Sequence, residues 1–425
     1  MQTSFPPERL ADPDMASSEA VIRKCVHCGF CTATCPTYVL LGDELDSPRG
    51  RIYLMKDMLE GGRDPTARVV KHIDRCLSCL SCMTTCPSGV NYMHLVDHAR
   101  AYIEERYRRP WRERLLRGLL ARVLPHPGRF RLALALARLV KPARPLFGKG
   151  PVGAMLDLAP AKRIRKAQRI AVVPDSPKGR VVLLQGCAEP VLRPGIRPAA
   201  ARLLTAAGYD VWLADGEVCC GSLVHHMGRK DEALDAARRN VDAWMAEIEG
   251  GGLRAIAITA SGCGVTIKDY GFMLREDPAY AEKAARVSGL ARDISELLAE
   301  IELPPMAAPR PLTIAYHAAC TLQHGQKITE APTRLLKAAG FTVRTPADAH
   351  LCCGSAGVYN ILQPEIAGQI GALKVATLEA LKADVIATGN IGCAIQIGVR
   401  TATPVVHTVE LLDWAAGGPA PEALQ

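Results

Sequence analysis

The sequence predicts a chain of two structural classes, in which a helical, cysteine-rich region precedes a duplicated α/β region. Three observations support this prediction. A C-x-x-C-x-x-C-x-x-x-C-P motif occurs twice within residues 25–87, strand and helix patterns alternate from about residue 178, and four cysteines of the second half recur at a nearly constant offset. We therefore expect an α + α/β fold with four parts, which are residues 1–106, 107–177, 178–308 and 309–425.

The two copies of the cysteine motif are the strongest signal in the chain. Their members are Cys25, Cys28, Cys31 and Cys35 before Pro36, and Cys76, Cys79, Cys82 and Cys86 before Pro87. This spacing is typical of cubane iron-sulfur sites, because three thiolates two residues apart turn onto one face of a tight loop. A zinc site usually takes two C-x-x-C pairs, and eight cysteines in two quartets exceed that pattern. We predict two [4Fe-4S] clusters in residues 1–106.

The motifs resemble those of two-cluster ferredoxins, in which the fourth cysteine of each motif ligates the other cluster. The resemblance implies two ligand sets, Cys25, Cys28, Cys31 and Cys86 for one cluster, and Cys76, Cys79, Cys82 and Cys35 for the other. Forty residues separate Cys35 from Cys76, with a helix pattern over 51–60, and a second helix is expected at about 92–106. This arrangement resembles the helical ferredoxin domains of succinate dehydrogenases and heterodisulfide reductases. Arg49 and Arg51 could neutralise cluster charge or lie at the surface.

A basic, amphipathic segment follows the cysteine motifs. Between Arg108 and Lys149 there are twelve Lys or Arg residues and one acid, Glu113, and Pro125 and Pro127 interrupt the helix pattern. The segment could lie on an anionic membrane surface, dock an acidic partner, or form linker helices with a solvated basic face. Nucleic acid is not expected as a partner, since no recognition motif accompanies the charge.

Neither a secretory signal nor an apolar stretch of about eighteen residues is found in the sequence. We therefore expect a cytoplasmic protein, peripheral on the cytoplasmic face of the inner membrane.

The second half contains an internal repeat. Strand patterns at 180–185, 209–213 and 255–259 recur at 312–316, 341–344 and 384–388, and helix patterns at 196–207 and 229–249 recur at 331–339 and 365–382. Cys187, Cys219, Cys220 and Cys263 are matched by Cys320, Cys352, Cys353 and Cys393, at offsets of 133, 133, 133 and 130 residues. Both central pairs continue as Cys-Cys-Gly-Ser, which indicates duplication.

These cysteines follow predicted strands, and ligands of open α/β sheets gather at the carboxyl ends of the strands. We therefore expect the four cysteines of each repeat to converge. The pattern resembles the CCG domain of heterodisulfide reductase and respiratory iron-sulfur subunits, whose motif ends in C-x-x-C and can hold a non-cubane cluster. Here Thr266 and Gln396 stand at the last cysteine of that motif. The resemblance leaves two alternatives, a further cluster or a scaffold that contacts a partner, a quinone or a flavin domain.

Five further residues near these cysteines in the sequence are weaker candidates. His317 precedes Cys320 by three residues and could be a ligand, a proton carrier or a structural residue. His225, His226, Tyr359 and Asn360 follow the two Cys-Cys-Gly-Ser sequences and are candidates for supporting contacts.

The segments 25–38, 40–46, 47–53 and 74–90 resemble the iron-sulfur subunits of bacterial glycolate oxidases. The resemblance implies an electron-transfer subunit of a complex in which separate FAD-binding subunits oxidise glycolate or D-lactate and electrons pass towards the quinone pool. In agreement, we find no G-x-G-x-x-G and no P-loop, so the chain by itself is not expected to oxidise the substrate. The alternatives are a subunit of an anaerobic glycerol-3-phosphate or lactate dehydrogenase, a heterodisulfide-reductase-like enzyme, and a binding module whose clusters are structural.

Overall fold

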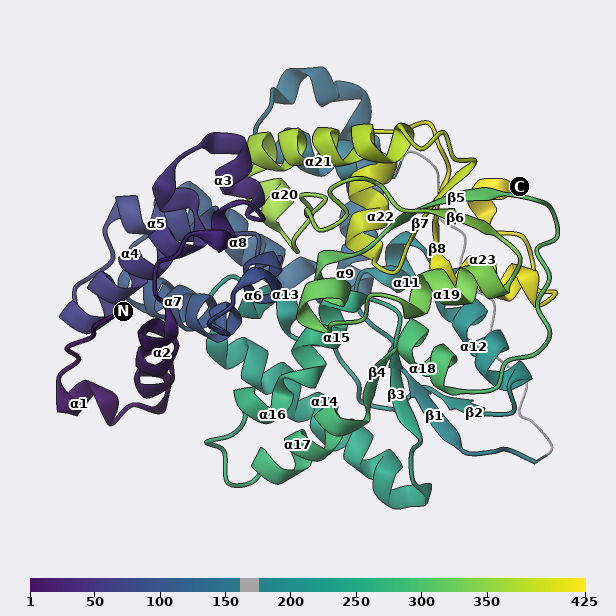
Figure 1. The fold of residues 1–425 in the computed structure, drawn as a ribbon, viewed down its shortest axis with the longest axis horizontal. Coiled ribbons are helices and arrows are strands. Elements are labelled where there is room, and N and C mark those ends of the chain that lie inside the picture. Colours follow the sequence, from purple (N-terminus) through teal and green to yellow (C-terminus); the bar gives the residue numbers. More distant parts are fainter. Residues whose placement is uncertain (161–175) are drawn as a thin grey trace.

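The computed structural model describes residues 1–160 and 176–425, and it divides into a helical N-terminal part and two parallel sheets (Figure 1). The N-terminal helices are α1 Pro7–Leu10, α2 Pro13–Lys24, η1 Phe30–Thr32, α3 Pro36–Leu41, η2 Glu44–Asp46, α4 Pro48–Gly61, α5 Ala67–Asp74, α6 Ser81–Thr85 and α7 Tyr92–Arg106. The helices predicted at 51–60 and 92–106 are therefore confirmed as α4 and α7.

Helix α4 shows why the segment between the two motifs is helical. The Ser47 side chain accepts a hydrogen bond from the Gly50 N–H at 3.0 Å, Pro48 occupies the first turn, and Gly62 ends the helix with a φ of 61°. The buried face of α4 joins α7 in one hydrophobic core, to which Met55 and Leu95 contribute fully buried side chains. Burial of each such side chain contributes about 1.5–3 kcal/mol.

The basic segment forms α8 Trp111–Val123, α9 Pro127–Val140, η3 Lys141–Phe147 and α10 Pro151–Leu158. The expected break between the helices at Pro125 and Pro127 is confirmed. The alternative of linker helices with a solvated basic face does not hold for Arg109 and Arg117, which are buried and pair with Asp74 of α5 at 2.6 and 3.0 Å. Residues 161–175, which belong to the predicted linker 107–177, lie outside the described part of the chain.

Each repeat forms one parallel sheet with the same strand order. The first sheet has the order β2-β1-β3-β4 and the second the order β6-β5-β7-β8. The strands are β1 Arg180–Leu183, β2 Asp210–Trp212, β3 Ala255–Ile258, β4 Ala291–Asp293, β5 Thr313–His317, β6 Thr342–Arg344, β7 Val385–Thr388 and β8 Val405–His407. The six predicted strands are confirmed, whereas the three-residue strands β4 and β8 were not predicted.

Helices cover both sheets. In the first repeat they are α11 Glu189–Leu192, α12 Ile196–Ala206, α13 Ser222–His225, α14 Lys230–Gly251, α15 Ser261–Lys268, α16 Tyr270–Met273, α17 Ala281–Leu290 and α18 Ile294–Glu300. In the second they are η4 Thr321–Gly325, α19 Ala331–Ala338, α20 Tyr359–Leu362, α21 Pro364–Glu379, α22 Ile391–Gly398, α23 Thr408–Ala415 and η5 Glu422–Leu424. The helices predicted at 196–207, 229–249, 331–339 and 365–382 are α12, α14, α19 and α21.

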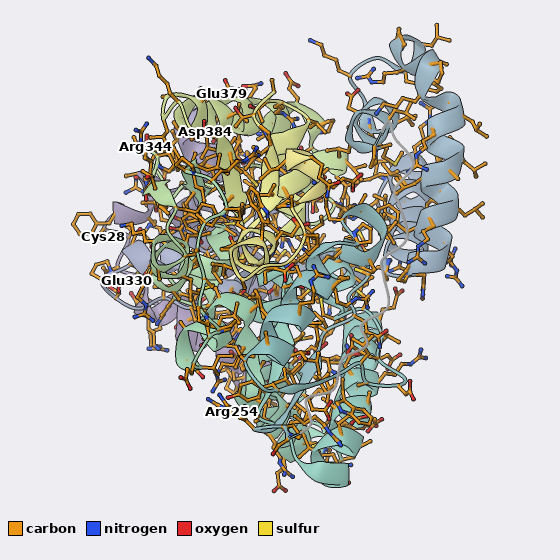
Figure 2. The ribbon with its side chains drawn as sticks, turned by 90° about the vertical axis from the view of Figure 1, so that its right-hand side faces the viewer. Cys28, Arg254, Glu330, Arg344, Glu379 and Asp384 are labelled. Carbon is orange, nitrogen blue, oxygen red and sulfur yellow. The ribbon has the colours of Figure 1, made fainter. Side chains whose placement is uncertain are left out.

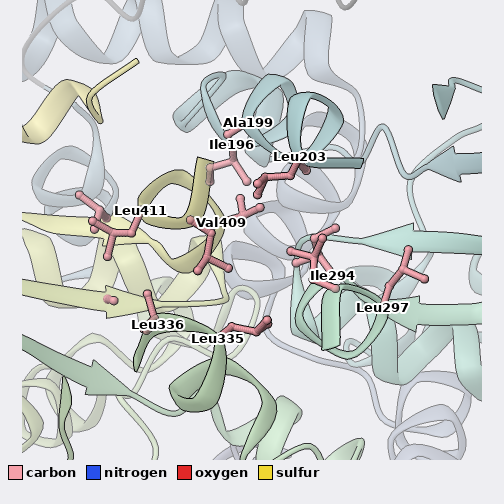
Figure 3. Packing of buried hydrophobic residues seen from close by; sticks show 14 of the residues in the cluster. Ile196, Ala199, Leu203, Ile294, Leu297, Leu335, Leu336, Val409 and Leu411 are labelled. Carbon is pink, nitrogen blue, oxygen red and sulfur yellow. The ribbon is translucent and has the colours of Figure 1, made fainter. Parts of the chain in front are cut away.

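The two repeats share one hydrophobic core (Figure 3). Helix α12 contacts α23 and α18 contacts α19, so that each repeat offers the same two helices to the other. Leu203 and Leu297 of the first repeat and Leu336 and Leu411 of the second are buried in this core. This reciprocal contact has the form of a two-fold interface within a single chain.

Within the described residues, we find no helix that has both the length and the apolarity required to cross a membrane.

Candidate iron-sulfur and thiol sites

The first predicted ligand set lies around one cavity. Cys25, Cys28, Cys31 and Cys86 all line it, and Cys82 reaches the same wall. Cys28 is exposed and lies at the edge of the molecule in Figure 2, whereas Cys25 is buried. The fourth cysteine of the second motif thus faces the first three of the first motif, as crossed ligation requires.

The second predicted set lies deeper in the protein. Cys35, Cys76 and Cys79 are buried. The Ser78 N–H and the Tyr92 hydroxyl donate to Cys76 Sγ at 3.4 and 3.7 Å. Hydrogen bonds to sulfur and exclusion of solvent are two of the properties that set a cluster potential.

Arg49 and Arg51, which the sequence left undecided, have different environments. Arg51 is 1% exposed, and its guanidinium contacts Asp46 Oδ1 at 3.2 Å and Cys35 Sγ at 3.8 Å. A buried cation needs such partners, because desolvation of the charge is costly. Arg49 is partly exposed and pairs with Glu44. Arg51 is therefore the arginine that places positive charge beside the deeper set.

In the first repeat the four cysteines converge as expected. Cys187 Sγ lies 3.4 Å from Cys219 Sγ, and the neighbouring thiols of Cys219 and Cys263 raise the pKa of Cys220. Gly221, with a φ of 81°, lets the backbone approach α14, since a Cβ atom there would lie 3.1 Å from Ala233 O.

The second repeat brings its cysteines together in the same way. Cys320 Sγ lies 3.8 Å from Cys352 Sγ, and the Gly354 N–H donates to Cys352 Sγ at 3.3 Å. The ligand atoms of His317, Cys353 and Cys393 lie within 4.8 Å of one another. The offset of 133 residues places Leu184 at the position of His317, so this histidine has no counterpart in the first repeat.

The second repeat lies directly against the deeper ferredoxin motif, a proximity that the sequence did not reveal. Leu77 and Cys79 belong to one apolar cluster with Cys352 and Tyr359, and Cys320 packs against it. Thr84 Oγ1 lies 2.7 Å from His324 Nδ1 across the same boundary. The thiols of the second repeat and those of the second motif are therefore neighbours.

The first repeat meets the ferredoxin region through charged groups instead. Asp14 of α2 accepts from Lys230 and Arg275, at 2.5 and 2.6 Å. His94 of α7 lies 2.9 Å from Asp269. The basic segment also reaches this repeat, because α9 contacts α11.

The proposed supporting role of His225 and His226 beside the thiols is corrected by their contacts. Their ring nitrogens lie 3.4 and 3.2 Å from the carboxylate of Asp97 in α7. Burial opposes ionisation of Asp97, but the two histidines outweigh it and hold the pKa of Asp97 well below its ordinary value. Desolvation opposes protonation of His225, yet Asp97 raises the pKa of this histidine. Both histidines thus serve the contact between the domains.

The other two supporting candidates also have definite partners. The Tyr359 hydroxyl donates to Arg75 O at 3.0 Å, and the ring packs with Cys79 and Cys352. Asn360 Nδ2 donates to Gln396 Oε1 at 3.2 Å. Tyr359 therefore belongs to the boundary with the deeper motif, and Asn360 belongs to the interior of the repeat.

Two cluster-type motifs on helices, joined to two cysteine-rich α/β units, define an iron-sulfur protein of the oxidoreductase class. Models of known families agree with this class. A 4Fe-4S dicluster domain model matches residues 24–90, and a cysteine-rich domain model matches residues 181–268 and 314–398.

The chain belongs to the family of glycolate oxidase iron-sulfur subunits. It is 43% identical to the glycolate oxidase iron-sulfur subunit of Escherichia coli, over 98% of this chain and 99% of that protein. It is 32% identical to the probable glycolate oxidase iron-sulfur subunit of Bacillus subtilis, over 94% and 95% of the two chains. Lactate utilization protein A of Bacillus licheniformis is 25% identical over 55% of this chain and 99% of its own length.

Among solved structures, a hypothetical protein from Helicobacter pylori has a similar fold, with a TM-score of 0.55 at 11% identity. The match covers 99% of this chain and 74% of that chain.

Proposed function

We propose that this chain is the electron-transfer subunit of a complex that oxidises glycolate to glyoxylate, taking electrons from FAD-binding subunits and passing them towards quinone. The observation that carries the proposal is the 43% identity to a glycolate oxidase iron-sulfur subunit over 98% of the chain, with all eight motif cysteines present. D-lactate is the second candidate substrate, because lactate utilization proteins match about half of the chain. The substrate reaction itself belongs to the partner subunits.

The cofactors that we propose are two [4Fe-4S] clusters. Cys25, Cys28, Cys31 and Cys86 would hold one, and Cys76, Cys79, Cys82 and Cys35 the other. The shared cavity of the first set and the buried Cys35 and Cys76 beside Arg51 support these sets. When bound, the clusters supply one-electron transfer at potentials set by charge, burial and hydrogen bonding.

The residues of this chain would give the two sites different roles. The exposed Cys28 makes the first site accessible to an electron donor at the surface. The second site is enclosed by the apolar cluster of Leu77, Cys79 and Tyr359, which excludes water. Arg51 holds a fixed positive charge 3.8 Å from Cys35 Sγ, which favours the thiolate and the reduced state of a site of negative charge.

The experiment that tests the ligand sets compares cysteine variants in pairs. Crossed ligation predicts that Cys28→Ser and Cys86→Ser lose the same EPR signal during an anaerobic redox titration. Cys79→Ser and Cys35→Ser should lose the other signal. Iron and sulfide analysis of the wild-type chain should give about eight of each. If Cys86→Ser loses the same EPR signal as Cys79→Ser, the crossed ligand sets are wrong.

The substrate proposal is tested on the assembled complex. Glycolate should drive quinone reduction by the complex with its flavoprotein subunits, and the isolated chain should show no glycolate oxidation. If the complex reduces quinone only with L- or D-lactate, or only with glycerol 3-phosphate, that compound is the substrate and the glycolate proposal is wrong.

We also propose that the basic segment contacts the surface of an anionic membrane. Its outward face carries large apolar side chains with exposed fractions of 53–84%, namely Trp111, Leu115, Leu119, Leu132, Leu136, Leu139 and Leu146. Figure 2 shows the segment in grey-blue at one edge of the molecule, with side chains directed outward. Apolar side chains among arginines suit the interface of an anionic bilayer.

Vesicle sedimentation tests the membrane proposal. The chain should bind vesicles that contain an anionic phospholipid, and replacement of Leu132, Leu136 and Leu139 by Ser should weaken this binding at least tenfold. Equal binding to neutral and anionic vesicles, or no effect of the three substitutions, would contradict it.

A further inference from the structure

His317 is a buried histidine whose ring has no hydrogen-bond partner. It lies at the end of β5, it is 1% exposed, and neither ring nitrogen has a partner among the described residues. Burial of polar atoms without partners is costly, and such atoms are rare in native proteins. An unseen ion is one of the few explanations for such a group.

The ring of His317 lies beside two buried thiols. The nearest ligand atoms of His317, Cys353 and Cys393 lie within 4.8 Å of one another. Zinc binds thiolate at about 2.3 Å and imidazole at about 2.0–2.1 Å, so the ligand atoms of a tetrahedral zinc ion lie about 3.5–3.8 Å apart. A contraction of about 1 Å would bring the trio to that spacing, and its nitrogen and sulfur donors suit zinc-type metals.

A fourth thiol is available next to the trio. Cys352 is the neighbour of Cys353 in the chain, and its Sγ lies 3.8 Å from Cys320 Sγ. Either sulfur could complete a tetrahedral set of one histidine and three cysteines, which is a common structural zinc set.

The first repeat lacks the nitrogen donor. The offset of 133 residues places Leu184 at the position of His317, and Leu184 is 3% exposed in an apolar cluster with Cys219 and Cys220. The same four cysteines are present there, but at this position a hydrocarbon side chain stands in place of the imidazole. The two repeats thus differ in donor chemistry at one position.

Lys374 gives the second repeat a charge that suits bound thiolates. It is 3% exposed in α21, and its Nζ donates to Asp348 O at 2.9 Å. Its counterpart is Asn240, since Gly221 and Gly354 make the same close approach to Ala233 and Ala367. One divalent ion with three thiolates carries a net charge of −1, which a neighbouring ammonium group stabilises.

We propose that the second repeat, and not the first, binds a single zinc-type divalent ion through His317, Cys353 and Cys393, with Cys320 or Cys352 as the fourth ligand. The missing last cysteine of the motif, at Gln396, is consistent with one ion in place of a cluster. Cys352, the chain neighbour of Cys353, belongs to the apolar cluster around Cys79, so the ion would fix the part of the repeat that adjoins the deeper motif.

The test is metal analysis of the full chain, purified without oxygen, for zinc, iron and sulfide. The wild-type chain should contain about one zinc ion, His317→Leu should reduce zinc at least tenfold, and Cys220→Ser, the first-repeat counterpart of Cys353, should leave it unchanged. His317→Leu copies the residue of the first repeat, so it is expected to fold. Iron and sulfide should be the same in all three proteins.

Cobalt substitution gives a second readout. Cobalt in place of zinc should show a thiolate-to-metal charge-transfer band and tetrahedral d–d bands, and His317→Leu should remove or shift them. A wild-type chain without zinc, zinc that survives His317→Leu, or loss of iron and sulfide together with His317 would overturn the proposal. The last outcome would identify a further cluster instead.

Discussion

The two repeats carry the same four cysteines on the same strand order, yet their surroundings have opposite character. In the first repeat, Glu189 and Glu217 each stand two residues from a cysteine in the sequence, and burial raises the pKa of each carboxyl to about 7. At the corresponding positions the second repeat has Leu322 and His350, and it adds His317. The two repeats thus share a scaffold and differ in the residues around it. The first has buried carboxyls with raised pKa values, and the second has the histidine that we propose as a metal ligand.

The repeats also differ in how they meet the ferredoxin region. The second contributes an apolar boundary at Cys79 and Tyr359, and the first contributes ionic contacts at Asp97 and Asp14. Apolar contact excludes water and keeps redox groups close, whereas ionic contact fixes orientation and depends on pH. One repeat is therefore suited to adjoin the electron path and the other to hold the domain in place.

The largest expected effect tests what the repeats share. Leu203 and Leu336 occupy matched positions in the common core and are 1% and 0% exposed. We consider the substitutions Leu203→Ala and Leu336→Ala. Each should lower the free energy of unfolding by about 2–5 kcal/mol, because a cavity adds to the lost burial. Anaerobic denaturant titrations followed by circular dichroism measure this. Leu373→Ala, at 53% exposure, is the control and should change little. If the two variants lose very different amounts of unfolding free energy, the repeats do not share one cooperative core.

The second prediction concerns the buried acids of the first repeat. Burial raises the pKa of Glu189 from 4.5 to about 7, so the native state holds a proton that the unfolded state releases between about pH 4.5 and 7. Stability contributed by this group therefore falls as pH rises through that range. Glu189→Gln keeps an acceptor for the Thr259 hydroxyl and should be more stable than wild type above pH 7, by up to about 3 kcal/mol.

Thermal unfolding at several pH values measures the effect of Glu189→Gln. The two proteins should converge near about pH 4.5, where both are uncharged at this position. Glu330→Gln, at an exposed position of the second repeat (Figure 2), is the control and should follow wild type. A constant difference at all pH values would contradict the assignment to a buried ionisation.

The third prediction tests the ionic boundary. The lowered pKa of Asp97 means that its contribution is present above about pH 4 and is lost as pH falls further. The raised pKa of His225 means that its contribution is lost as pH rises through a value above 6.5. Asp97→Asn should lower stability by about 2 kcal/mol near pH 6, with a smaller loss at high pH. A loss that is the same near pH 6 and pH 9 would show that the histidines are not charged in this contact.

The smallest effect is expected at the apolar boundary. Tyr359→Phe keeps the ring against Cys79 and removes the hydrogen bond to Arg75 O, which should cost about 1 kcal/mol at any pH between about 5 and 8. The same unfolding experiment measures it. A pH-dependent loss would remove the distinction between the ionic and the apolar boundary.

Features that depend on local spacing could be predicted from the sequence. The two cysteine motifs, the helices at α4 and α7, six of the eight described strands and the duplicated cysteines all follow from patterns within short segments. Such patterns are readable because a cap, a proline or an alternation of apolar residues acts on its own neighbours. Strands β4 and β8 were not predicted, although β2 and β6, which were predicted, are equally short.

The contacts between groups far apart in the chain could not be predicted, because they depend on how the domains pack. Nothing near Arg51 in the chain indicates that it is 1% exposed beside Cys35, and Lys374 gives no local sign of its burial. The contact of Cys79 with Cys352 joins residues 273 positions apart and depends on how the second repeat packs on the deeper motif. Long-range packing fixes burial and neighbouring charge, and these decide what a thiol or an imidazole can do, whereas spacing fixes only which donors are present.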